Sequence, residues 1–516
     1  MMKIGIVALA GAVFCAVVVA QTRPAPPAGP STRPATGPAT QARLPFTISK
    51  ETTYLTEPLC ADGTVDYVGA LNARYSKGVT KDTNAAVILV TLLPDLLAKE
   101  VREEAFKRLD IKPAAGQVTL DLASGDKKEY APLQATPWKS SDSLDAAKWL
   151  KANEKGLNLL IQAAARPRYY VPLLSDPRHT LMFELPTPDY SQLRAASRVL
   201  LMRANLAIGE GRVADAWKDI RAVYQLAALL EQDTTLVGRL VEVGMGNLAN
   251  AGALNIAASG KLSAKDAKTM IAELERIPVA TTLDAIEFER LEMLDLIVRL
   301  ATGGGEQKNL MESLLVMIGE KPGDMGKFPQ AMTDAAKGID WNDILLRANQ
   351  MHDKLLAAVK APSVAARTQL AATISQETKQ MLARIAAGGG KPPAASAPVK
   401  ERTQWMGDFI IGLLMPAIEK TQTMAEAGAV QRQMTMISLA AAACRADKGR
   451  FPEKLADLSP AYLKQVPKDF FSGKDFVYKP AADGYILYSV GENGKDDGGK
   501  GRSENGDDLV VRIMRR

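Results

Sequence analysis

Apolar residues recur at every third or fourth position over a long central stretch of this sequence, residues 142–387. The members of one such series are Trp217, Ile220, Val223, Ala227 and Leu230. This spacing places the apolar side chains on one face of an α-helix. The stretch therefore predicts a helical domain whose amphipathic helices bury their apolar faces against each other.

Short turns that contain glycine separate the expected helices, which include residues 193–209, 212–232 and 236–258. Ser263 followed by Asp266 indicates a capping box at the start of another helix. The first two helices resemble a tetratricopeptide unit, but the chain lacks a clear period of about 34 residues. We therefore favour a plain helical bundle or hairpin array.

Composition indicates a chain of several domains with helix-rich cores. Of the 516 residues, 47% are hydrophobic but only 5% are aromatic, so Ala, Leu, Met and Val should fill the cores. The formal net charge of +6 is spread along the chain, and no Lys/Arg cluster is interleaved with aromatic residues. This pattern argues against a nucleic-acid partner.

The first residues have the pattern of a secretory signal peptide. Lys3 precedes an apolar run from Ile4 to Ala20, with small residues before the expected cleavage after Ala20. An uncleaved membrane anchor is the alternative. Residues 21–43 are rich in Pro, Ala and Thr and predict an extended linker. We expect an exported protein, periplasmic or associated with the cell envelope.

Cleavage at this site would leave two cysteines, Cys60 and Cys444. They could pair in an oxidising compartment, but they lie far apart in the sequence. Two ordinary thiols are the favoured interpretation.

Residues 44–135 predict a compact region of mixed α/β character. Its expected helices are residues 64–75, 84–93 and 99–109. Residues 117–122 alternate between polar and apolar side chains, which predicts a strand.

A second linker, residues 388–400, is rich in Gly, Pro and Ala. The apolar run from Phe409 to Met415 that follows is too short to span a bilayer. We expect this run to pack on the protein, with membrane-surface contact as the alternative. Pro416 predicts a kink in the helix or a new start.

The last part of the chain, residues 401–516, predicts a small domain made of a helix and an antiparallel sheet. Gly449 signals the end of a long helix. Three short runs, residues 476–478, 485–490 and 509–513, are rich in β-branched and aromatic residues and predict strands. The expected fold class is therefore α+β and predominantly α-helical.

Residues 492–508, between the last two expected strands, combine glycines with many carboxylates. Calcium prefers six to eight oxygen ligands on a flexible backbone, which glycines permit. The loop departs from the EF-hand pattern because Lys495 stands where that pattern requires an oxygen donor. A solvated acidic loop is the alternative to a calcium site. The expected ligands are Asn493, Asp496, Asp497, Asp507 and Asp508.

The order of these parts resembles the globular head of the major pseudopilin of type II secretion systems. The matching residues occupy the turn after the long helix, the segment before the first strand, and the last loop. They are Gly449, Phe451 and Pro452, then Asp469, Phe471, Gly473 and Tyr478, then Gly491, Asn493, Gly494, Lys495, Gly498, Gly499, Asp507 and Asp508. The resemblance implies a calcium-binding head and a partner in the cell envelope or secretion system.

The chain departs from that family at two places. Phe470 stands where a proline is usual. The beginning of the chain lacks the Gly-Phe cleavage site and the long apolar helix with a glutamate at its fifth position. Assembly into a fibre by the pseudopilin route is therefore not implied.

The whole chain also resembles a family of exported, planctomycete-type proteins. The residues that carry this likeness are 64–79, 216–227 and 341–355, followed by the pseudopilin-like end. The likeness implies one architectural unit and assigns no activity.

Residues suited to catalysis are few. Of the two histidines, His179 falls in a Pro-containing connection and His352 in a polar helix, and both are expected to be structural or surface residues. Glu287, Glu289 and Glu292 lie within two turns of one expected helix, where a solvated face is the simplest interpretation. We therefore expect a non-enzymatic structural or interaction protein. An exported hydrolase with its active site in the helical domain is the alternative.

Overall fold

The structure is a computed structural model that describes residues 44–112, 116–174, 181–233, 235–278, 282–303, 307–317, 326–361 and 364–514. The expected signal peptide and first linker, residues 1–43, lie outside these ranges. The expected fold class is confirmed, since the chain is 63% helical with a small three-stranded antiparallel sheet near its C-terminus.

The helices follow the apolar periodicity of the sequence. They are α2 (Tyr67–Ser76), α3 (Ala85–Leu92), α4 (Lys99–Arg108), α5 (Leu122–Gly125), α6 (Ala131–Ala135), α7 (Leu144–Ala152), α8 (Glu154–Ala164), α9 (Tyr190–Gly209), α10 (Val213–Leu229), α11 (Leu236–Ala258), α12 (Ala264–Arg276), α13 (Leu283–Thr302), α14 (Gln307–Met317), α15 (Phe328–Ala335), α16 (Trp341–Val359), α17 (Val364–Ala387) and α18 (Val399–Lys448). The expected cap of α12 is present, because Ser263 Oγ accepts a hydrogen bond from Asp266 N at 3.1 Å.

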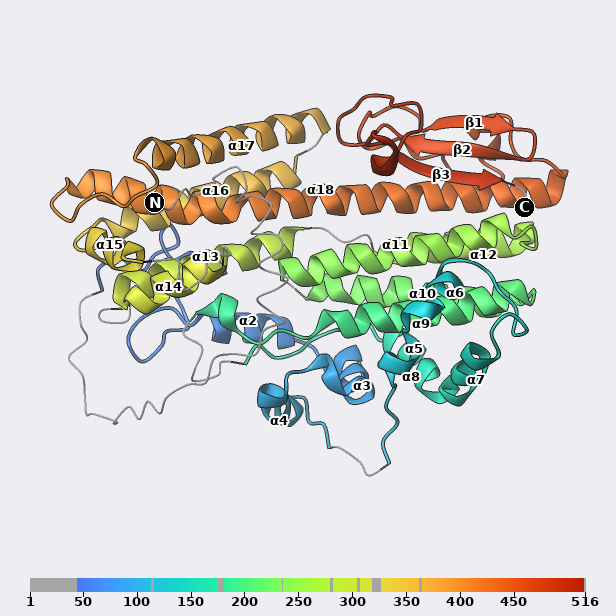
Figure 1. Cartoon of the computed structure of the whole chain (residues 1–516), viewed down its shortest axis with the longest axis horizontal. Helices are drawn as coiled ribbons and strands as arrows, with labels where there is room; N and C mark the ends of the chain where they lie inside the picture. The colour runs from blue at the N-terminus through green and yellow to red at the C-terminus, as the bar shows by residue number, and fades with distance from the viewer. Residues whose placement is uncertain are drawn as a thin grey trace.

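Helix α18 is the longest of the described helices and runs along the long axis of the molecule (Figure 1). It runs for 50 residues, with α11 along one side and α17 and the sheet along the other. It ends at Gly449, whose φ of 73° is left-handed as the cap requires. The expected new start at Pro416 is wrong, because α18 is continuous there. Proline removes one helical hydrogen bond, and packing of both halves of α18 offsets that loss.

The interior contains two hydrophobic cores, and α18 contributes to both. The first core joins α3 and α7–α12 to the sheet and to the second half of α18, where Met434, Ile437 and Leu439 are buried. The second core joins α2 and α13–α17 to the first half of α18. Each core thus draws on all three segments expected as domains, residues 44–135, 142–387 and 401–516.

The sheet consists of β1 (Val477–Ala481), β2 (Gly484–Ser489) and β3 (Leu509–Met514) in that order. All three expected strands are present, each within a few residues of the predicted bounds. The central strand β2 turns Tyr485 and Leu487, both fully buried, toward the core. The turn after α18 is tied to the sheet, because Tyr478 Oη donates to Pro452 O at 2.8 Å.

The expected strand at residues 117–122 is wrong. Leu120 and Leu122 are buried as the alternation predicts, but no described strand lies beside them. The amide of Leu120 donates to Leu92 O at 2.9 Å, and this bond holds the segment against the end of α3. Alternating burial therefore exists here without a sheet.

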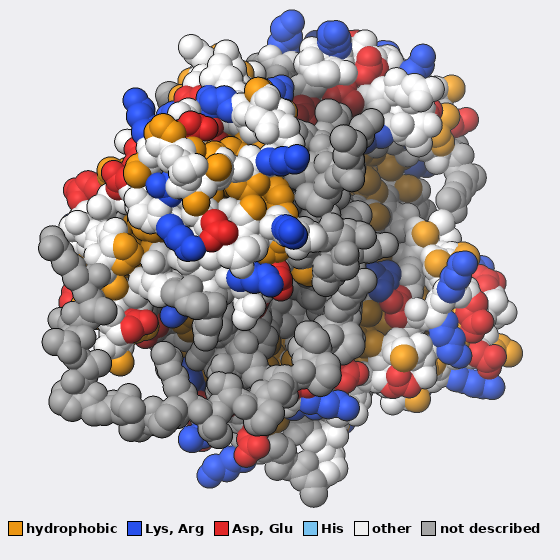
Figure 2. Space-filling view, turned by 60° about the vertical axis from the view of Figure 1, so that its left-hand side comes forward, with side chains coloured by type: hydrophobic (Ala, Val, Ile, Leu, Met, Phe, Trp, Pro, Cys, Tyr) orange, Lys and Arg blue, Asp and Glu red, His pale blue; other side chains and the backbone are white. Residues whose placement is uncertain are grey.

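Acidic and basic side chains are interspersed over the face shown in Figure 2. None of the described helices combines the length and the apolar character needed to cross a bilayer. The run from Phe409 to Met415 lies in the second core, where Ile410, Ile411 and Met415 are fully buried. Cys60 and Cys444 are free thiols, the first half-buried and the second buried.

Candidate metal centre

The acidic loop is held at both ends by the sheet. It leaves β2 after Ser489 and enters β3 at Leu509, and these two residues face each other across the two strands. Gly491, at a φ of 69°, folds the loop back so closely that an added Cβ would lie 2.3 Å from Asp507 O. This close approach requires glycine and brings the beginning of the loop beside its end.

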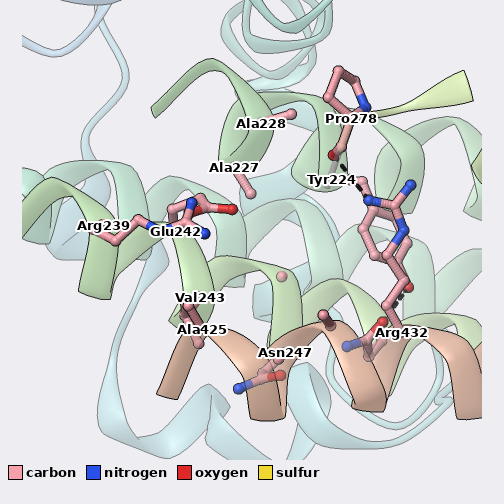
Figure 3. A pocket seen from close by; sticks show the side chains of 14 residues that line it. Tyr224, Ala227, Ala228, Arg239, Glu242, Val243, Asn247, Pro278, Ala425 and Arg432 are labelled. Atoms are coloured by element: carbon pink, nitrogen blue, oxygen red, sulfur yellow. Dashed lines mark hydrogen bonds and ion pairs between the residues drawn. The ribbon is translucent and has the colours of Figure 1, made fainter. Parts of the chain in front are cut away.

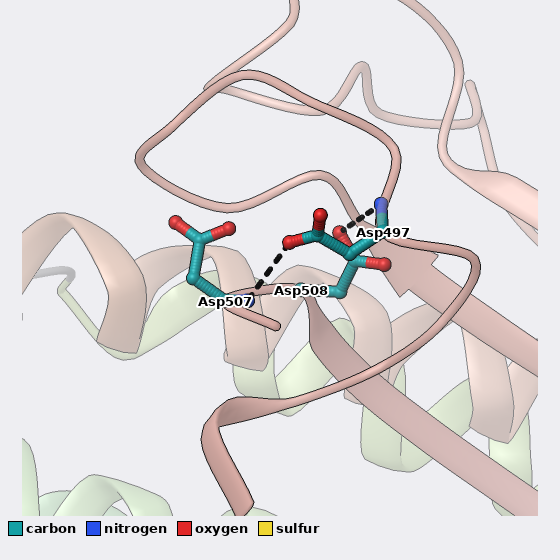
Figure 4. Close-up of side chains that lie close together, drawn as sticks. All are labelled: Asp497, Asp507 and Asp508. Carbon is teal, nitrogen blue, oxygen red and sulfur yellow. Dashed lines mark hydrogen bonds between the residues drawn. The ribbon is translucent and has the colours of Figure 1, made fainter. Parts of the chain in front are cut away.

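Three carboxylates converge within this loop (Figure 4). Asp497, Asp507 and Asp508 each offer an oxygen atom, and the three atoms lie within 4.8 Å of one another. Asp508 is only 3% exposed. Within the described part of the chain, none of the three forms an ion pair. Three negative charges so close together repel one another, so their arrangement favours a bound cation.

Amide groups of the loop orient these carboxylates. Asp508 Oδ2 accepts a hydrogen bond from Gly499 N at 2.7 Å, and Asp497 Oδ2 accepts one from Asp507 N at 3.0 Å. Asn493 N donates to Asp507 Oδ2 at 2.9 Å. The amide of Asp507 and the side chain of Asn493 lower the pKa of the Asp497 carboxyl. The carboxylate is therefore held in its charged form.

One oxygen atom of this cluster has no hydrogen-bond partner. Asp507 Oδ1 is buried, and none of the described residues donates to it. A buried carboxylate oxygen without a donor is costly, and a cation would satisfy it. Three carboxylates supply part of the six to eight oxygens that calcium prefers, and loop carbonyls and water can supply the others.

The structure brings together three of the five expected ligands. Asn493 lies beside them and is tied into the loop, because its Oδ1 accepts a hydrogen bond from Lys495 N at 2.6 Å and its Nδ2 donates to Asp497 Oδ2 at 3.2 Å. Asp496 is turned aside, because its Oδ1 accepts from Tyr488 Oη at 3.0 Å and from Gly498 N at 2.8 Å.

Asp469 lies outside the acidic loop and holds the segment from which the loop starts. The sequence did not reveal this role. Asp469 is 1% exposed and accepts hydrogen bonds from Ser489 Oγ at 2.7 Å and Ser472 Oγ at 2.8 Å. It thereby fixes the end of β2, where the loop begins. A buried role could have been suspected from the spacing of Asp469 and Ser472, which is typical of a turn closed by an aspartate side chain.

A second acidic cluster lies on α13, where we expected a solvated face. Glu287 meets that expectation and pairs with Arg74 Nη1 at 2.7 Å. Glu289 and Glu292 are instead half-buried, and the loss of solvation raises the pKa of both carboxyls. The charge of Glu289 raises the pKa of Glu292 further. The pair therefore holds a proton that separate carboxyls would lose.

A small hollow lies between α10, α11 and α18 (Figure 3). Its volume is about 50 Å³, enough for a few water molecules. Glu242 lines it and pairs with Arg239, and burial raises the pKa of Glu242 to about 7. Arg432 donates to Ile277 O at 2.6 Å and to Pro278 O at 3.0 Å, beyond the end of α12. The charged groups of Glu242, Arg239 and Arg432 are thus used in ion pairs and hydrogen bonds within the fold.

His352 is a structural residue in this fold. It is fully buried, its Nδ1 lies 2.9 Å from Ala348 O, and burial lowers its pKa to about 4. His179 lies outside the described residues.

No protein-family model, curated protein sequence or solved structure matches this chain. The likeness of residues 401–516 to the pseudopilin head therefore depends on the residues named above.

Proposed function

We propose that the protein is an exported, non-enzymatic structural or interaction component of the cell envelope, and that its C-terminal domain binds calcium and docks onto another envelope protein. The observation that carries this proposal is the convergence of Asp497, Asp507 and Asp508 around a buried carboxylate oxygen without a partner. The resemblance to the pseudopilin head supports both the metal and the location.

Calcium would act on the shape of the docking domain. Asp497 lies in the first half of the loop and Asp507 and Asp508 lie at its end, and a cation between them would cancel most of their repulsion. Because Asp508 directly precedes β3, the ion would also fix the start of that strand. The head would then present one rigid surface to its partner, which a secretion system or another envelope assembly would supply.

Calorimetry with the purified protein tests the metal site. We expect calcium to bind and to raise the melting temperature, and Asp507→Ala combined with Asp508→Ala to abolish both effects. Glu492→Ala, an exposed carboxylate in the same loop, is the matched control and should bind as the wild type does. Absence of binding heat, together with a melt that a chelator leaves unchanged, would remove the metal from this proposal.

Cross-linking in envelope fractions tests the docking role. We expect the same envelope protein to be captured by the wild type and by the Glu492→Ala control, and to be lost from the double aspartate variant. Equal capture by all three would show that docking does not depend on the metal loop.

An exported hydrolase remains the second candidate, and the Glu289–Glu292 pair is the observation that favours it. A carboxyl pair with raised pKa values is an arrangement used for acid–base catalysis. A panel of ester and glycoside substrates tests this candidate. Activity lost in Glu292→Gln but kept in Glu287→Gln would support it, and inactivity of the wild type on the panel would argue against it.

A further inference from the structure

The sequence contains two asparagines that directly precede a glycine, and both pairs lie in the acidic loop. They are Asn493 with Gly494 and Asn505 with Gly506. In such a pair the backbone nitrogen of the glycine can attack the side-chain carbonyl of the asparagine, because glycine has no side chain to block the approach. Both asparagines are exposed to water. The surroundings of each pair therefore decide which of the two reacts in the folded protein.

The two glycines differ in their freedom to move. A Cβ added at Gly494 would meet no atom within 4 Å, whereas one added at Gly506 would lie 2.2 Å from Lys500 O. The Gly494 amide donates to Gly491 O at 3.3 Å, beyond the usual range for such bonds. The Gly506 amide donates to Gly501 O at 3.1 Å, within that range. Because attack requires the glycine to rotate and its amide bond to break, Gly494 is the better placed of the two.

A backbone amide activates the side-chain carbonyl of Asn493. Asn493 Oδ1 accepts a hydrogen bond from Lys495 N at 2.6 Å. Negative charge develops on this oxygen when the carbonyl carbon is attacked, and a backbone N–H held in place stabilises such charge. Within the described part of the chain, the side chain of Asn505 has no such donor. The carbonyl and the glycine thus both favour reaction at Asn493.

We propose that Asn493 is a site of spontaneous deamidation, which converts its side-chain amide into a carboxylate. The nitrogen of Gly494 bonds to Asn493 Cγ and loses its proton to water, while the Cγ–Nδ2 bond breaks and ammonia leaves. Water then opens the cyclic imide. Cleavage of the new Cγ–N bond gives aspartate, and cleavage of the original main-chain bond gives isoaspartate. One ammonia leaves and one water is added, so the reaction needs no oxidant or reductant.

The product adds negative charge to a cluster that is already acidic. Asn493 Nδ2 donates to Asp497 Oδ2 at 3.2 Å, and deamidation replaces this donor by a carboxylate oxygen. Two like charges then face each other, which destabilises the loop when no metal is bound. A cation at Asp497, Asp507 and Asp508 would meet a fourth carboxylate. This last consequence rests on the proposed calcium site, whereas the deamidation itself does not.

Peptide mass spectrometry of the full chain, incubated with chelator at mildly alkaline pH, tests the site. We expect aspartate and isoaspartate to form at Asn493 about tenfold faster than at Asn505. In denaturant the two pairs should react at similar rates, because only the fold distinguishes them. Absence of conversion at Asn493 in the folded protein overturns the proposal. So do equal rates at the two sites in the folded protein, or a difference that persists in denaturant.

Two variants at the same position test the assignment and its consequence. Asn493→Gln keeps an amide but would have to close a larger ring, so it should stop the mass gain there and leave the slow conversion at Asn505 unchanged. Asn493→Asp imitates the product and should melt at a lower temperature than the fresh wild type in chelator. The melting temperature of the aged wild type should fall toward that of Asn493→Asp. A mass gain at this position that persists in Asn493→Gln would contradict the assignment, and an unchanged melt of Asn493→Asp would contradict the loss of stability.

Discussion

The loop before β3 and the helix α13 each gather several carboxylates, and each region accommodates the repulsion in a different way. In the loop, backbone amides hold the carboxylates of Asp497 and Asp508 in place, so that their oxygens converge. On α13, loss of solvation raises the pKa of both Glu289 and Glu292, which favours their protonated forms. A cation is the expected ligand of the first cluster, and a proton is the ligand of the second.

The difference depends on which hydrogen-bond donors each region can offer to its carboxylates. Loop residues have backbone amides that are free to donate, because no helix uses them. Residues in the middle of a helix have already used theirs, so their carboxyls must find protons, arginines or each other. Clustered acidic residues in a sequence therefore have different meanings in a glycine-rich loop and in a helix.

The largest expected effect concerns the α13 pair. Replacing Glu289 and Glu292 by Gln should raise the free energy of unfolding by about 3 kcal/mol at pH 8 and change it little at pH 5. The sign follows from the raised pKa values, because the wild-type pair stabilises the fold when protonated and this contribution is lost as the pH rises. Both proteins keep His352, so its titration cancels in the comparison.

Denaturant unfolding of both proteins at several pH values measures this effect. Glu287→Gln on the same helix is the control and should show no such pH dependence, because Glu287 is paired with Arg74. A double variant that is destabilised equally at both pH values would contradict the raised pKa values.

The next largest effect concerns the choice of ligands in the loop. Asp497→Asn should weaken calcium binding tenfold or more, which corresponds to at least about 1.4 kcal/mol. Asp496→Asn should leave the affinity within about twofold of the wild type, because that side chain is bound to Tyr488. Titration calorimetry of the two variants measures the difference. Equal losses would mean that the loop rearranges when the ion binds.

The smallest expected effect concerns Asn493. Asn493→Ala removes the side-chain hydrogen bonds to Lys495 N and Asp497, and should cost about 1 kcal/mol of stability without metal. Calcium affinity should change little, since an uncharged amide holds a cation less strongly than the three carboxylates do. Thermal unfolding in the presence of chelator measures the stability, and a large loss of affinity would return Asn493 to the ligands.

The elements that could be predicted from the sequence are those set by local chemistry. Gly449 ends α18 because glycine adopts the left-handed cap readily, and the three strands coincide with runs rich in β-branched and aromatic residues. The strand expected at residues 117–122 and the new helix start expected at Pro416 were wrong because both outcomes depend on contacts far away in the sequence. A strand needs a neighbour, and a proline breaks a helix only where packing does not hold both sides.

In the candidate metal site, too, the features set by local sequence could be predicted, and those set by contacts between distant residues could not. Glycines and carboxylates in sequence located the loop, and the loop does bring Asp497, Asp507 and Asp508 together. The orientation of Asp496 depends on Tyr488, which lies on β2, and the raised pKa values of Glu289 and Glu292 depend on burial within the fold. Neither feature is encoded in the spacing of the acidic residues themselves.

The continuity of α18 has a mechanical consequence. At 1.5 Å per residue, its 50 residues extend for about 75 Å. Because one continuous helix enters both cores, a pull on the sheet would be transmitted along it from the first core to the second. The load would reach α16 and α17 at the far end, where Asp408 on α18 is paired with both Arg347 and Arg384.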